Sequence, residues 1–288
     1  MKTGVIGLGA MGAGMAWNLQ RQGFLAVVWN RTPSRAEPFA GQEGIRVAGS
    51  PEELARCCEL IVTCVSRDVD VKQAISATLP GLTAGTIVAD TSTINAATAR
   101  ELAAQLGAWG VEFLDCPVSG GVEGARQGTL AMMVGGNAGA LERAQPVLAA
   151  IARHIVHMGP SGSGQATKAV NQIMAAGINQ AVTEALAFGE AMGLPMDKVL
   201  DVVGSGAAAN WFLEHRAKNM LEGRFSPGFR VSLHHKDLSI CREMAKNAAS
   251  LPVTEMTITD YERLMQQGRG DEDISALFRV KRSAYKKQ

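Results

Sequence analysis

The sequence lacks a concentration of charge of either sign. Its 28 Lys and Arg residues nearly balance its 27 Asp and Glu residues, so the formal net charge is +1. Lys286 and Lys287 form one short block of like charge near the end of the sequence. A nucleic-acid backbone or an anionic membrane surface is bound by a concentrated basic surface. The composition therefore argues against both kinds of partner.

Long apolar runs and metal-binding spacings are missing as well. No apolar run approaches the roughly 18 residues of a transmembrane helix. Met1-Lys2 leads almost directly into Val5-Ile6, which leaves no room for the apolar region of a signal peptide. The five cysteines form no CxxC pair and no Cys/His spacing typical of zinc. We expect a cytoplasmic protein with reduced, buried thiols and no metal site.

The 288 residues suffice for one large domain or two ordinary ones, and the chain begins with a nucleotide-binding pattern. An apolar run at 4–8 leads into a glycine-rich loop, a helical segment follows at 13–22, and a second strand-like run lies at 25–29. Glycines in such a loop permit a tight turn and the close approach of a pyrophosphate, which the helix N-terminus attracts. The unit predicts dinucleotide binding by the residues Gly7-Leu8-Gly9-Ala10-Met11-Gly12.

The turn after the second strand indicates which dinucleotide is bound. An NAD site usually has a carboxylate here for the ribose 2′-hydroxyl, but no Asp or Glu lies between Gly12 and Glu37. The turn has Asn30-Arg31-Thr32 instead, and a guanidinium is suited to the 2′-phosphate of NADP. We predict that NADPH is preferred over NADH. A solvated loop arginine is the alternative for Arg31.

Further strand-like runs alternate with helical segments such as 95–107. This alternation predicts a doubly wound, mostly parallel sheet with both faces covered, and ligands bind such sheets outside the carboxyl ends of the strands. We therefore expect the residues that follow the strands to contact the ligands. These residues are Val65, Ser66, Thr93, Ser119, Gly120 and Gly121. The expected strands are 60–65, 86–89, 111–114, 130–134 and 154–157.

Beyond Gly164 the pattern becomes helical. A proline-free helix is predicted over 165–192, apolar around much of its circumference and hence largely buried. The fold class is thus α/β, with a Rossmann-type domain at 1–163 and an all-α domain at 164–288 that begins with a long interdomain helix. Such a helix needs a partner surface, so we expect a homodimer or homotetramer; cover by the chain's own helices is the alternative. The other helices are expected near 196–204, 209–222, 236–249, 254–267 and 273–286.

Four motifs follow one another along the chain: 4–12, Asp115-Cys-Pro-Val-Ser-Gly-Gly121, Gly162-Ser-Gly-Gln-Ala-Thr-Lys168-Ala-Val-Asn171 and Lys236-Asp237-Leu238. In this order they make the chain resemble the β-hydroxyacid dehydrogenase family, the group of 3-hydroxyisobutyrate dehydrogenase, tartronate semialdehyde reductase and glyoxylate/succinic semialdehyde reductase. The resemblance implies an NADP-dependent oxidoreductase that interconverts a small hydroxy acid and its aldehyde acid. Tartronate, succinic or methylmalonate semialdehyde and glyoxylate are the candidate substrates.

The resemblance assigns the proton-transfer chemistry to Lys168. An ammonium bonded to the carbonyl oxygen can stabilise its growing negative charge and donate a proton, and the neutral amine can accept one in the oxidative direction. Asn171 lies three residues later on the same side of a helix and is expected to orient the substrate or Lys168. An ordinary surface lysine and an ordinary helix asparagine are the alternatives.

The remaining roles follow from the same resemblance. Ser119, Gly120 and Gly121 are expected to bind the substrate carboxylate, since successive N–H groups and a hydroxyl can form an anion-binding concavity; a structural tight turn is the alternative. Thr93 is placed beside the nicotinamide, unless it merely caps the 95–107 helix. Lys236 is expected to reach the cofactor from the helical domain.

Other activities compete with this interpretation. Adjacent histidines at 234–235 do not share a helix face, so we expect packing or pocket-lining roles rather than a metal pair. Imine reductases share the Asn-Arg-Thr turn but usually lack the catalytic lysine. A 6-phosphogluconate dehydrogenase needs a longer helical domain. A non-catalytic NADP(H) sensor would not need Lys168, Asn171 and Ser119 together.

Overall fold

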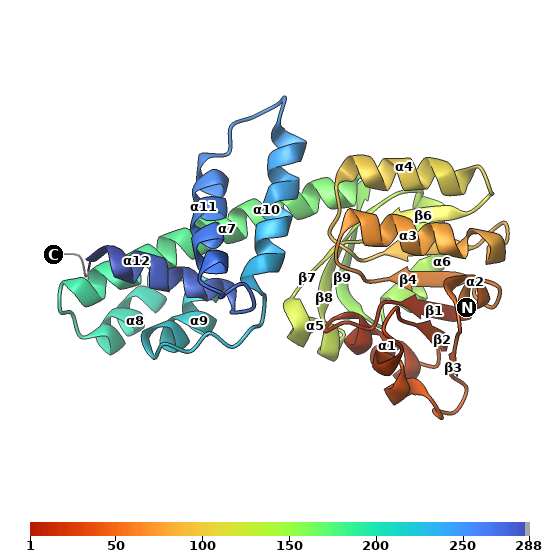
Figure 1. The fold of residues 1–288 in the computed structure, drawn as a ribbon, viewed down its shortest axis with the longest axis horizontal. Coiled ribbons are helices and arrows are strands. Elements are labelled where there is room, and N and C mark those ends of the chain that lie inside the picture. The colour runs from red at the N-terminus through yellow and green to blue at the C-terminus, as the bar shows by residue number, and fades with distance from the viewer. Residues whose placement is uncertain (286–288) are drawn as a thin grey trace. The chain divides into compact units, whose positions relative to one another are not determined.

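The structure is a computed structural model that describes residues 1–285. The chain separates into two compact units, one formed by Met1–Lys168 and the other beginning at Ala169 (Figure 1). The first contains the sheet with its helices, and the second is helical. Each unit is described by itself.

The first unit is built on a nine-stranded sheet with the order β3-β2-β1-β4-β5-β6-β8-β7, and β9 pairs with β8. Neighbours from β3 to β6 are parallel, whereas β8 runs antiparallel to β6 and β7. The predicted Rossmann-type, mostly parallel sheet is confirmed. The strands are β1 (Thr3–Ile6), β2 (Leu25–Trp29), β3 (Arg46–Val47), β4 (Leu60–Thr63), β5 (Ile87–Asp90), β6 (Glu112–Asp115), β7 (Val118–Ser119), β8 (Leu130–Gly135) and β9 (Ala152–Gly159).

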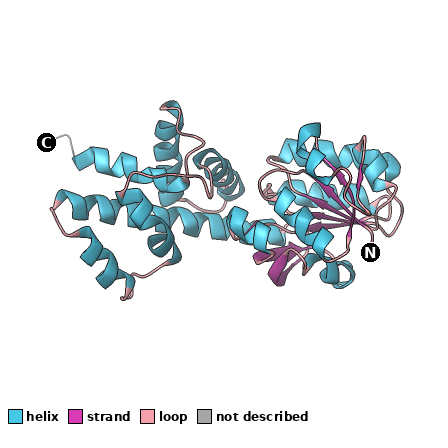
Figure 2. Ribbon diagram, turned by 90° about the horizontal axis from the view of Figure 1, so that it is seen from below, coloured by secondary structure: helices cyan, strands magenta, loops and turns pink. Residues whose placement is uncertain are grey.

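Helices cover both faces of this sheet (Figure 2). Successive strand residues point to opposite faces, so Val5 and Ile6 enter two different buried hydrophobic clusters, as do Ile61 and Val62. Among the cysteines, Cys57 is exposed, which corrects the expectation that all of them are buried. The helices are α1 (Gly12–Arg21), α2 (Pro51–Ala55), α3 (Asp68–Thr78), α4 (Ala96–Gly107), α5 (Gly121–Gln127) and α6 (Ala138–Leu148).

The second unit contains most of α7 (Ser163–Ala191) and the helices after it. Its core is a single cluster that includes Leu186, Leu238 and Phe278. Within it, Asn179 Nδ2 donates hydrogen bonds to Tyr261 Oη and to Ile274 O, both at 2.9 Å. The remaining helices are α8 (Met196–Gly204), α9 (Trp211–Leu221), α10 (Val231–Ala245), α11 (Pro252–Gln266) and α12 (Leu277–Tyr285).

Two helices begin four or more residues away from the predicted start. Helix α10 begins at Val231 rather than near 236, because the preceding turn is held by a distant carboxylate: Asp273 Oδ2 accepts hydrogen bonds from the N–H groups of Gly228 and Phe229. Helix α12 begins at Leu277 after a short 3-10 turn. The predicted end of this helix at residue 286 lies outside the described residues.

In the single chain, helix α7 is buried on one side only. Val170, Met174 and Phe188 are exposed to 58%, 61% and 51% of their surface. The opposite side of the helix enters the core of the second unit through Leu186 and Ala187. In the part of the chain that the structure describes, no helix is long and apolar enough to span a bilayer.

Candidate active site

The loop between β1 and α1 fits a dinucleotide. Gly7 has a φ of +96°, which favours glycine. A Cβ on Gly12 would overlap the carbonyl oxygen of Gly7, so the tight turn requires glycine there. At Gly9 the nearest atom to an added Cβ is Arg35 Nη1, 3.7 Å away. The backbone is therefore open to a pyrophosphate on this side, with α1 behind it.

Asn30 ties this loop to the turn after β2. Its Oδ1 accepts a hydrogen bond from Leu8 N at 2.8 Å, and its Nδ2 donates to Thr32 O at 2.9 Å. Arg31, in the same turn, is exposed, and its Nη1 lies 2.9 Å from Asp70 Oδ1 on α3. The sequence did not indicate this carboxylate partner, which is distant along the chain.

The predicted residues after β4 and β5 are joined through Ser92. Val65 N donates to Ser92 Oγ at 3.0 Å, while Ser66 is exposed. Thr93 is half-buried beside Ser92. The cap of α4 is Asn95, whose Oδ1 accepts from the N–H of residue 97. The alternative in which Thr93 caps this helix is therefore wrong.

A buried carboxylate that sequence reasoning missed supports this segment. Asp90 Oδ1 accepts hydrogen bonds from Thr63 Oγ1 at 2.6 Å and Ser92 Oγ at 2.7 Å. Thr63 and Asp90 end neighbouring strands and are paired in register. Burial raises the pKa of the Asp90 carboxyl to about 6, although these hydrogen bonds favour the charged form. Polar residues at the ends of two adjacent strands were the available sequence signal.

Asp90→Asn is expected to remove part of the pH dependence of stability. The folded protein keeps the Asp90 proton up to about pH 6, whereas the ordinary carboxyl loses it near pH 3.8. The folded state therefore binds more protons between these values, and stability falls as pH rises through them. Asparagine retains an acceptor at Oδ1, the atom that accepts both hydroxyl bonds, while no partner for Oδ2 was found in the described chain.

Melting temperatures of the wild type and Asp90→Asn should be compared at pH 4 and pH 7. As pH rises from 4 to 7, the free energy of unfolding of the variant should increase relative to that of the wild type, by an amount on the order of 3 kcal/mol. Asp197→Asn, at an exposed position on α8, is the control and should show little change. An equal difference between variant and wild type at both pH values would contradict the argument.

The start of α7 is held by Asp115, the last residue of β6. Its Oδ1 accepts from Gly162 N at 2.8 Å and its Oδ2 from Gln165 N at 2.9 Å, so a carboxylate satisfies N–H groups at the helix N-terminus. A Cβ on Gly164 would lie 2.5 Å from the carbonyl oxygens of Asp115 and Met133. Burial raises the pKa of the Asp115 carboxyl above its ordinary value. The helix therefore begins directly against β6 and β8.

Gln165 lies in this anchored first turn of α7, and Lys168 lies in the next turn. Gln165 is buried; its Oε1 accepts from Ile94 N at 3.1 Å, and its Nε2 donates to Ser92 O at 2.8 Å. Lys168 is only 7% exposed. The alternative of an ordinary surface lysine is therefore wrong, and Gln165 is a residue whose contacts sequence reasoning missed.

The structure forms a glycine turn at the predicted carboxylate site. Strand β7 ends at Ser119, and Gly120 and Gly121 follow with φ values of +131° and +63°. Both values favour glycine. The segment therefore forms the tight turn that was the alternative interpretation. Carboxylate binding at Ser119, Gly120 and Gly121 stays a prediction.

In the second unit, two buried side chains join the predicted residues Asn171 and Lys236. Asn171 Nδ2 donates to Gln172 Oε1 at 2.8 Å, and Gln172 Nε2 donates to Asp237 Oδ2 at 2.6 Å. Lys236 Nζ lies 2.7 Å from Asp237 Oδ1. Gln172 had no predicted role. Asp237 appeared in a motif, but its contacts depend on α7 and α10 packing together.

Of the two histidines, His234 behaves as a packing residue, whereas the side chain of His235 is 22% exposed. His234 is fully buried, with Nδ1 3.0 Å from Tyr261 Oη and Nε2 3.3 Å from Gln172 O. The predicted packing role of His234 is confirmed. Among residues 1–285, no group of three or more His, Cys, Asp or Glu side chains is arranged to hold a metal ion.

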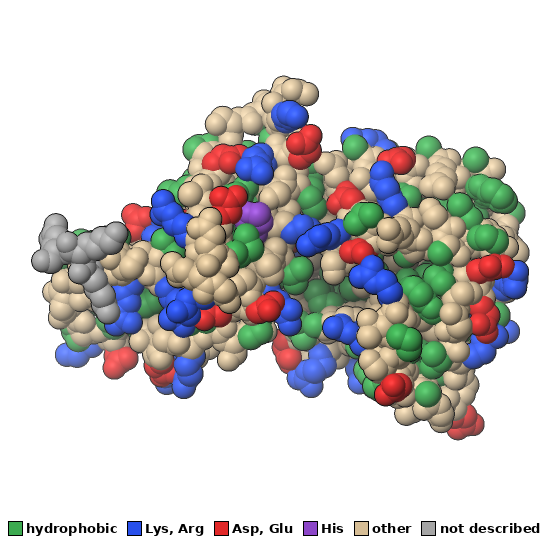
Figure 3. Space-filling model, in the orientation of Figure 1, with side chains coloured by type: hydrophobic (Ala, Val, Ile, Leu, Met, Phe, Trp, Pro, Cys, Tyr) green, Lys and Arg blue, Asp and Glu red, His purple; other side chains and the backbone are tan. Residues whose placement is uncertain are grey.

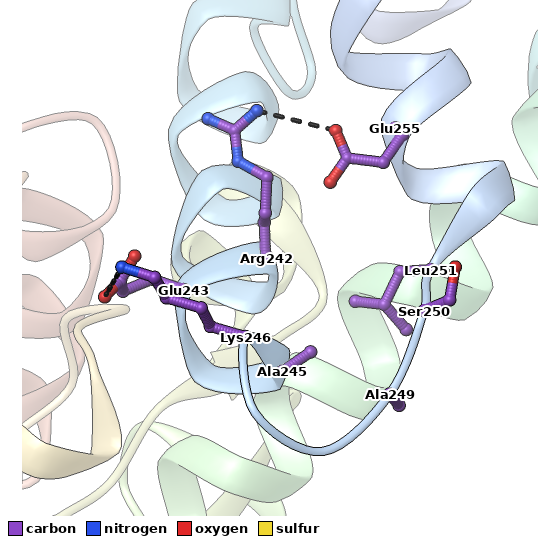
Figure 4. A pocket seen from close by; sticks show the side chains of 8 residues that line it. All are labelled: Arg242, Glu243, Ala245, Lys246, Ala249, Ser250, Leu251 and Glu255. Carbon is purple, nitrogen blue, oxygen red and sulfur yellow. Dashed lines mark hydrogen bonds and ion pairs between the residues drawn. The ribbon is translucent and has the colours of Figure 1, made fainter.

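A cavity of about 350 Å³ lies at the connection between α10 and α11 (Figure 4). Arg242 Nη1 lies 3.5 Å from Glu255 Oε2, and Lys246 Nζ lies 3.9 Å from Glu243 Oε1, so its charges are already paired. None of the predicted site residues line it. On the face drawn in Figure 3, basic and acidic side chains are interspersed rather than gathered in one basic patch.

The open glycine loop, the Rossmann-type sheet and the helical second unit define a nicotinamide-dependent dehydrogenase. Residues 2–159 match the NAD binding domain of 6-phosphogluconate dehydrogenase, and residues 162–281 match the NAD-binding region of NADP-dependent 3-hydroxyisobutyrate dehydrogenase. The chain belongs to the β-hydroxyacid dehydrogenase family. It is an NAD(P)-dependent hydroxyacid dehydrogenase.

Three known proteins show the extent of the similarity. The 2-hydroxy-3-oxopropionate reductase of Escherichia coli is 34% identical over 283 residues, which cover 96% of each chain. The Mycobacterium tuberculosis 3-hydroxyisobutyrate dehydrogenase solved with L-serine is 31% identical, with a TM-score of 0.87 over 97% of this chain and 98% of that one. Psf3, solved with NADP+ and 2-OPP, is 26% identical, with a TM-score of 0.88 over 96% and 99% of the two chains.

Proposed function

We propose that the protein uses NADPH to reduce a small aldehyde acid to its hydroxy acid, and that it catalyses the reverse reaction, with Lys168 as general acid and base. The observation that carries this proposal is the burial of Lys168 on a helix whose first turn is bound to the segment after β5 and to the end of β6. Ligands of such sheets bind at these strand ends. The name of the Escherichia coli relative, a 2-hydroxy-3-oxopropionate reductase, supports an aldehyde acid as substrate.

In the proposed mechanism, Lys168 acts on the carbonyl oxygen. Bound NADPH supplies the hydride that reduces the carbonyl carbon. As negative charge grows on the oxygen, the Lys168 ammonium stabilises it and donates a proton from Nζ. In the oxidative direction the neutral amine accepts the proton of the hydroxyl group. Asn171, one helical turn further along α7, orients the reacting group or Lys168.

The other predicted residues hold the two ligands. In this proposal Ser119, Gly120 and Gly121 bind the substrate carboxylate, and Gly7–Gly12, Asn30–Thr32, Val65, Ser66 and Thr93 contact the cofactor. Lys236 approaches the cofactor from the helical part. We assign cofactor binding to 1–163, and substrate selection and subunit contact to 164–288.

An NADPH-oxidation assay against a panel of small aldehyde acids tests the proposal. The panel contains tartronate semialdehyde, succinic semialdehyde, methylmalonate semialdehyde and glyoxylate, with cyclic imines as the competing substrates. Turnover of at least one aldehyde acid, and oxidation of the matching hydroxy acid with NADP+, is the expected result. Activity on cyclic imines alone, or NADPH binding without turnover of any compound, would overturn it.

A preference for NADPH forms part of the proposal, supported by Arg31 and Arg35 beside the loop. Because a guanidinium–phosphate bond is charge-assisted, Arg31→Ala should lower the NADPH-over-NADH ratio of kcat/KM by about tenfold or more. Asp70 competes with the phosphate for the Arg31 guanidinium at 2.9 Å. Asp70→Asn should therefore raise the same ratio.

The two substitutions thus change cofactor preference in opposite directions, and steady-state kinetics with both cofactors measures this. Arg56→Ala is the control, because Arg56 is also an exposed arginine paired with a carboxylate, that of Glu52. Its ratio should equal that of the wild type. Equal catalytic efficiency of the wild type with NADPH and NADH would disprove the preference.

We further propose that the exposed face of α7 contacts a second copy of the chain. At about 100° per residue, Val170, Met174, Ile178 and Phe188 lie within an arc of roughly 80°, and all four are exposed. A continuous apolar strip along a helix of 29 residues is typical of a helix-mediated contact. A homodimer, or a tetramer of such dimers, would cover it.

Met174→Glu combined with Phe188→Glu should dissociate this contact. Light scattering after gel filtration is expected to give at least twice the chain mass for the wild type and the mass of one chain for the double variant. Val202→Glu introduces the same charge at an apolar position on α8 that is 68% exposed, and it should leave the mass unchanged. A monomeric wild type at micromolar concentration would contradict the proposal.

A further inference from the structure

We infer that Gln165 is a positioning residue that holds the segment bearing Thr93 in register with Lys168. This inference rests on the proposed roles of Lys168 and Thr93 and deepens them. Gln165 is 1% exposed and lies three residues before Lys168, so both occupy the first two turns of α7. Its side-chain amide connects that helix to the loop after β5.

The amide of Gln165 binds the backbone on both sides of Thr93. Its Nε2 donates to Ser92 O at 2.8 Å, and its Oε1 accepts from Ile94 N at 3.1 Å. One side chain therefore holds the residue before Thr93 and the residue after it. A glutamine is suited to this task because its amide is donor and acceptor at once. Thr93 itself, between these two held residues, is half-buried.

The same glutamine is itself fixed from two directions. Its backbone N–H donates to Asp115 Oδ2 at 2.9 Å, which locks the first turn of α7 to β6. Ser92, its partner in the loop, donates from Oγ to Asp90 and accepts from Val65 N. Val65 and the two neighbours of Thr93 thus share one hydrogen-bond network with Gln165, which lies three residues before Lys168 on α7. A displacement of about 1 Å between groups positioned in this way can cost roughly a hundredfold in rate.

Gln165→Met tests the inference because methionine has a similar length and removes both hydrogen bonds. In the protein without cofactor, amide hydrogen exchange in residues 91–95 is expected to accelerate by at least about tenfold. With the substrate identified by the assay above, kcat is expected to fall by at least about tenfold. The Kd for NADPH, measured by fluorescence titration, should change by less than about threefold because the glycine loop is untouched.

Gln180→Met is the matched control. Gln180 is also a buried glutamine on α7, with its Nε2 3.1 Å from Thr257 Oγ1 and 3.2 Å from Asp260 Oδ2. Its replacement removes comparable hydrogen bonds within the second unit. It should lower the melting temperature while leaving kcat and exchange at 91–95 close to the wild type. A general loss of stability is thereby separated from a loss of positioning.

Gln165→Glu provides a rescue experiment. The ionised carboxylate still accepts from Ile94 N but repels Ser92 O, whereas the neutral acid accepts and donates as the amide does. Burial and the nearby carboxylates of Asp115 and Asp90 raise the pKa of the introduced carboxyl, whereas the N-terminus of α7 and the Lys168 cation lower it. Exchange at 91–95 and kcat, each relative to wild type at the same pH, should therefore recover as pH falls. Gln165→Met should show no recovery.

The outcomes separate this inference from the proposed function. If amide hydrogen exchange at 91–95 in Gln165→Met equals that of the wild type, Gln165 is not a positioning residue. Faster exchange with an unchanged kcat would overturn the inference as well. Full activity of Lys168→Ala would instead disprove the proposed role of Lys168, and the exchange measurement would still decide whether Gln165 holds the loop. Turnover of a different substrate would correct the substrate class and leave the kinetic comparison intact.

Discussion

Lys168→Ala is expected to lower kcat by at least about a hundredfold, the lower range for loss of a general acid–base group. The ammonium both stabilises the charge on the carbonyl oxygen and supplies its proton, and no water molecule replaces a group held this well by the helix. NADPH affinity should change little, since Lys168 lies on α7 whereas the dinucleotide loop lies between β1 and α1.

Single-turnover measurement of NADPH oxidation isolates the step concerned. Lys168→Arg retains the positive charge but holds its proton too tightly to donate it. It should therefore be nearly as slow as Lys168→Ala if proton transfer matters, and substantially faster if only charge matters. Lys198→Ala, at an exposed position on α8, is the control and should keep wild-type turnover. Wild-type turnover in Lys168→Ala would rule out the assigned role.

Gly12→Ala is expected to raise the Kd for the nicotinamide cofactor by at least about a hundredfold. The new Cβ would overlap the Gly7 carbonyl oxygen and lie 3.2 Å from Cys64 Cβ, so the loop must open. An opened loop loses at least two charge-assisted hydrogen bonds to the pyrophosphate, worth roughly 1.5–3 kcal/mol each. Fluorescence titration with NADPH measures the loss directly.

Gly107→Ala is the matched control for this substitution. Gly107 ends α4, and nothing lies within 4 Å of an added Cβ. Alanine there should leave cofactor affinity unchanged and raise stability by up to about 1 kcal/mol through helix propensity. If Gly12→Ala binds NADPH as tightly as Gly107→Ala does, the loop is not the pyrophosphate site.

Local patterns identified the parts of the site that depend on short-range geometry. The sequence alone located the glycine loop, since a strand, three glycines and a helix suffice to define a turn that a pyrophosphate can approach. It likewise placed Lys168 and Asn171 on one helix by their spacing. A long-range contact changed another expectation: α10 starts at Val231 because Asp273 holds the preceding turn.

The sequence by itself therefore determined the Rossmann-type sheet, the helical second unit, the dinucleotide loop and the lysine that we propose as the proton donor. Only the tertiary structure decided what surrounds them. It pairs Arg31 with Asp70, Asp115 with the start of α7, and Gln165 with the backbone on both sides of Thr93. Ile94, one of these partners, lies 71 residues before Gln165 in the sequence. Periodicity and spacing report on neighbours within a few residues, whereas these side chains meet because separate strands end at the same edge of one sheet.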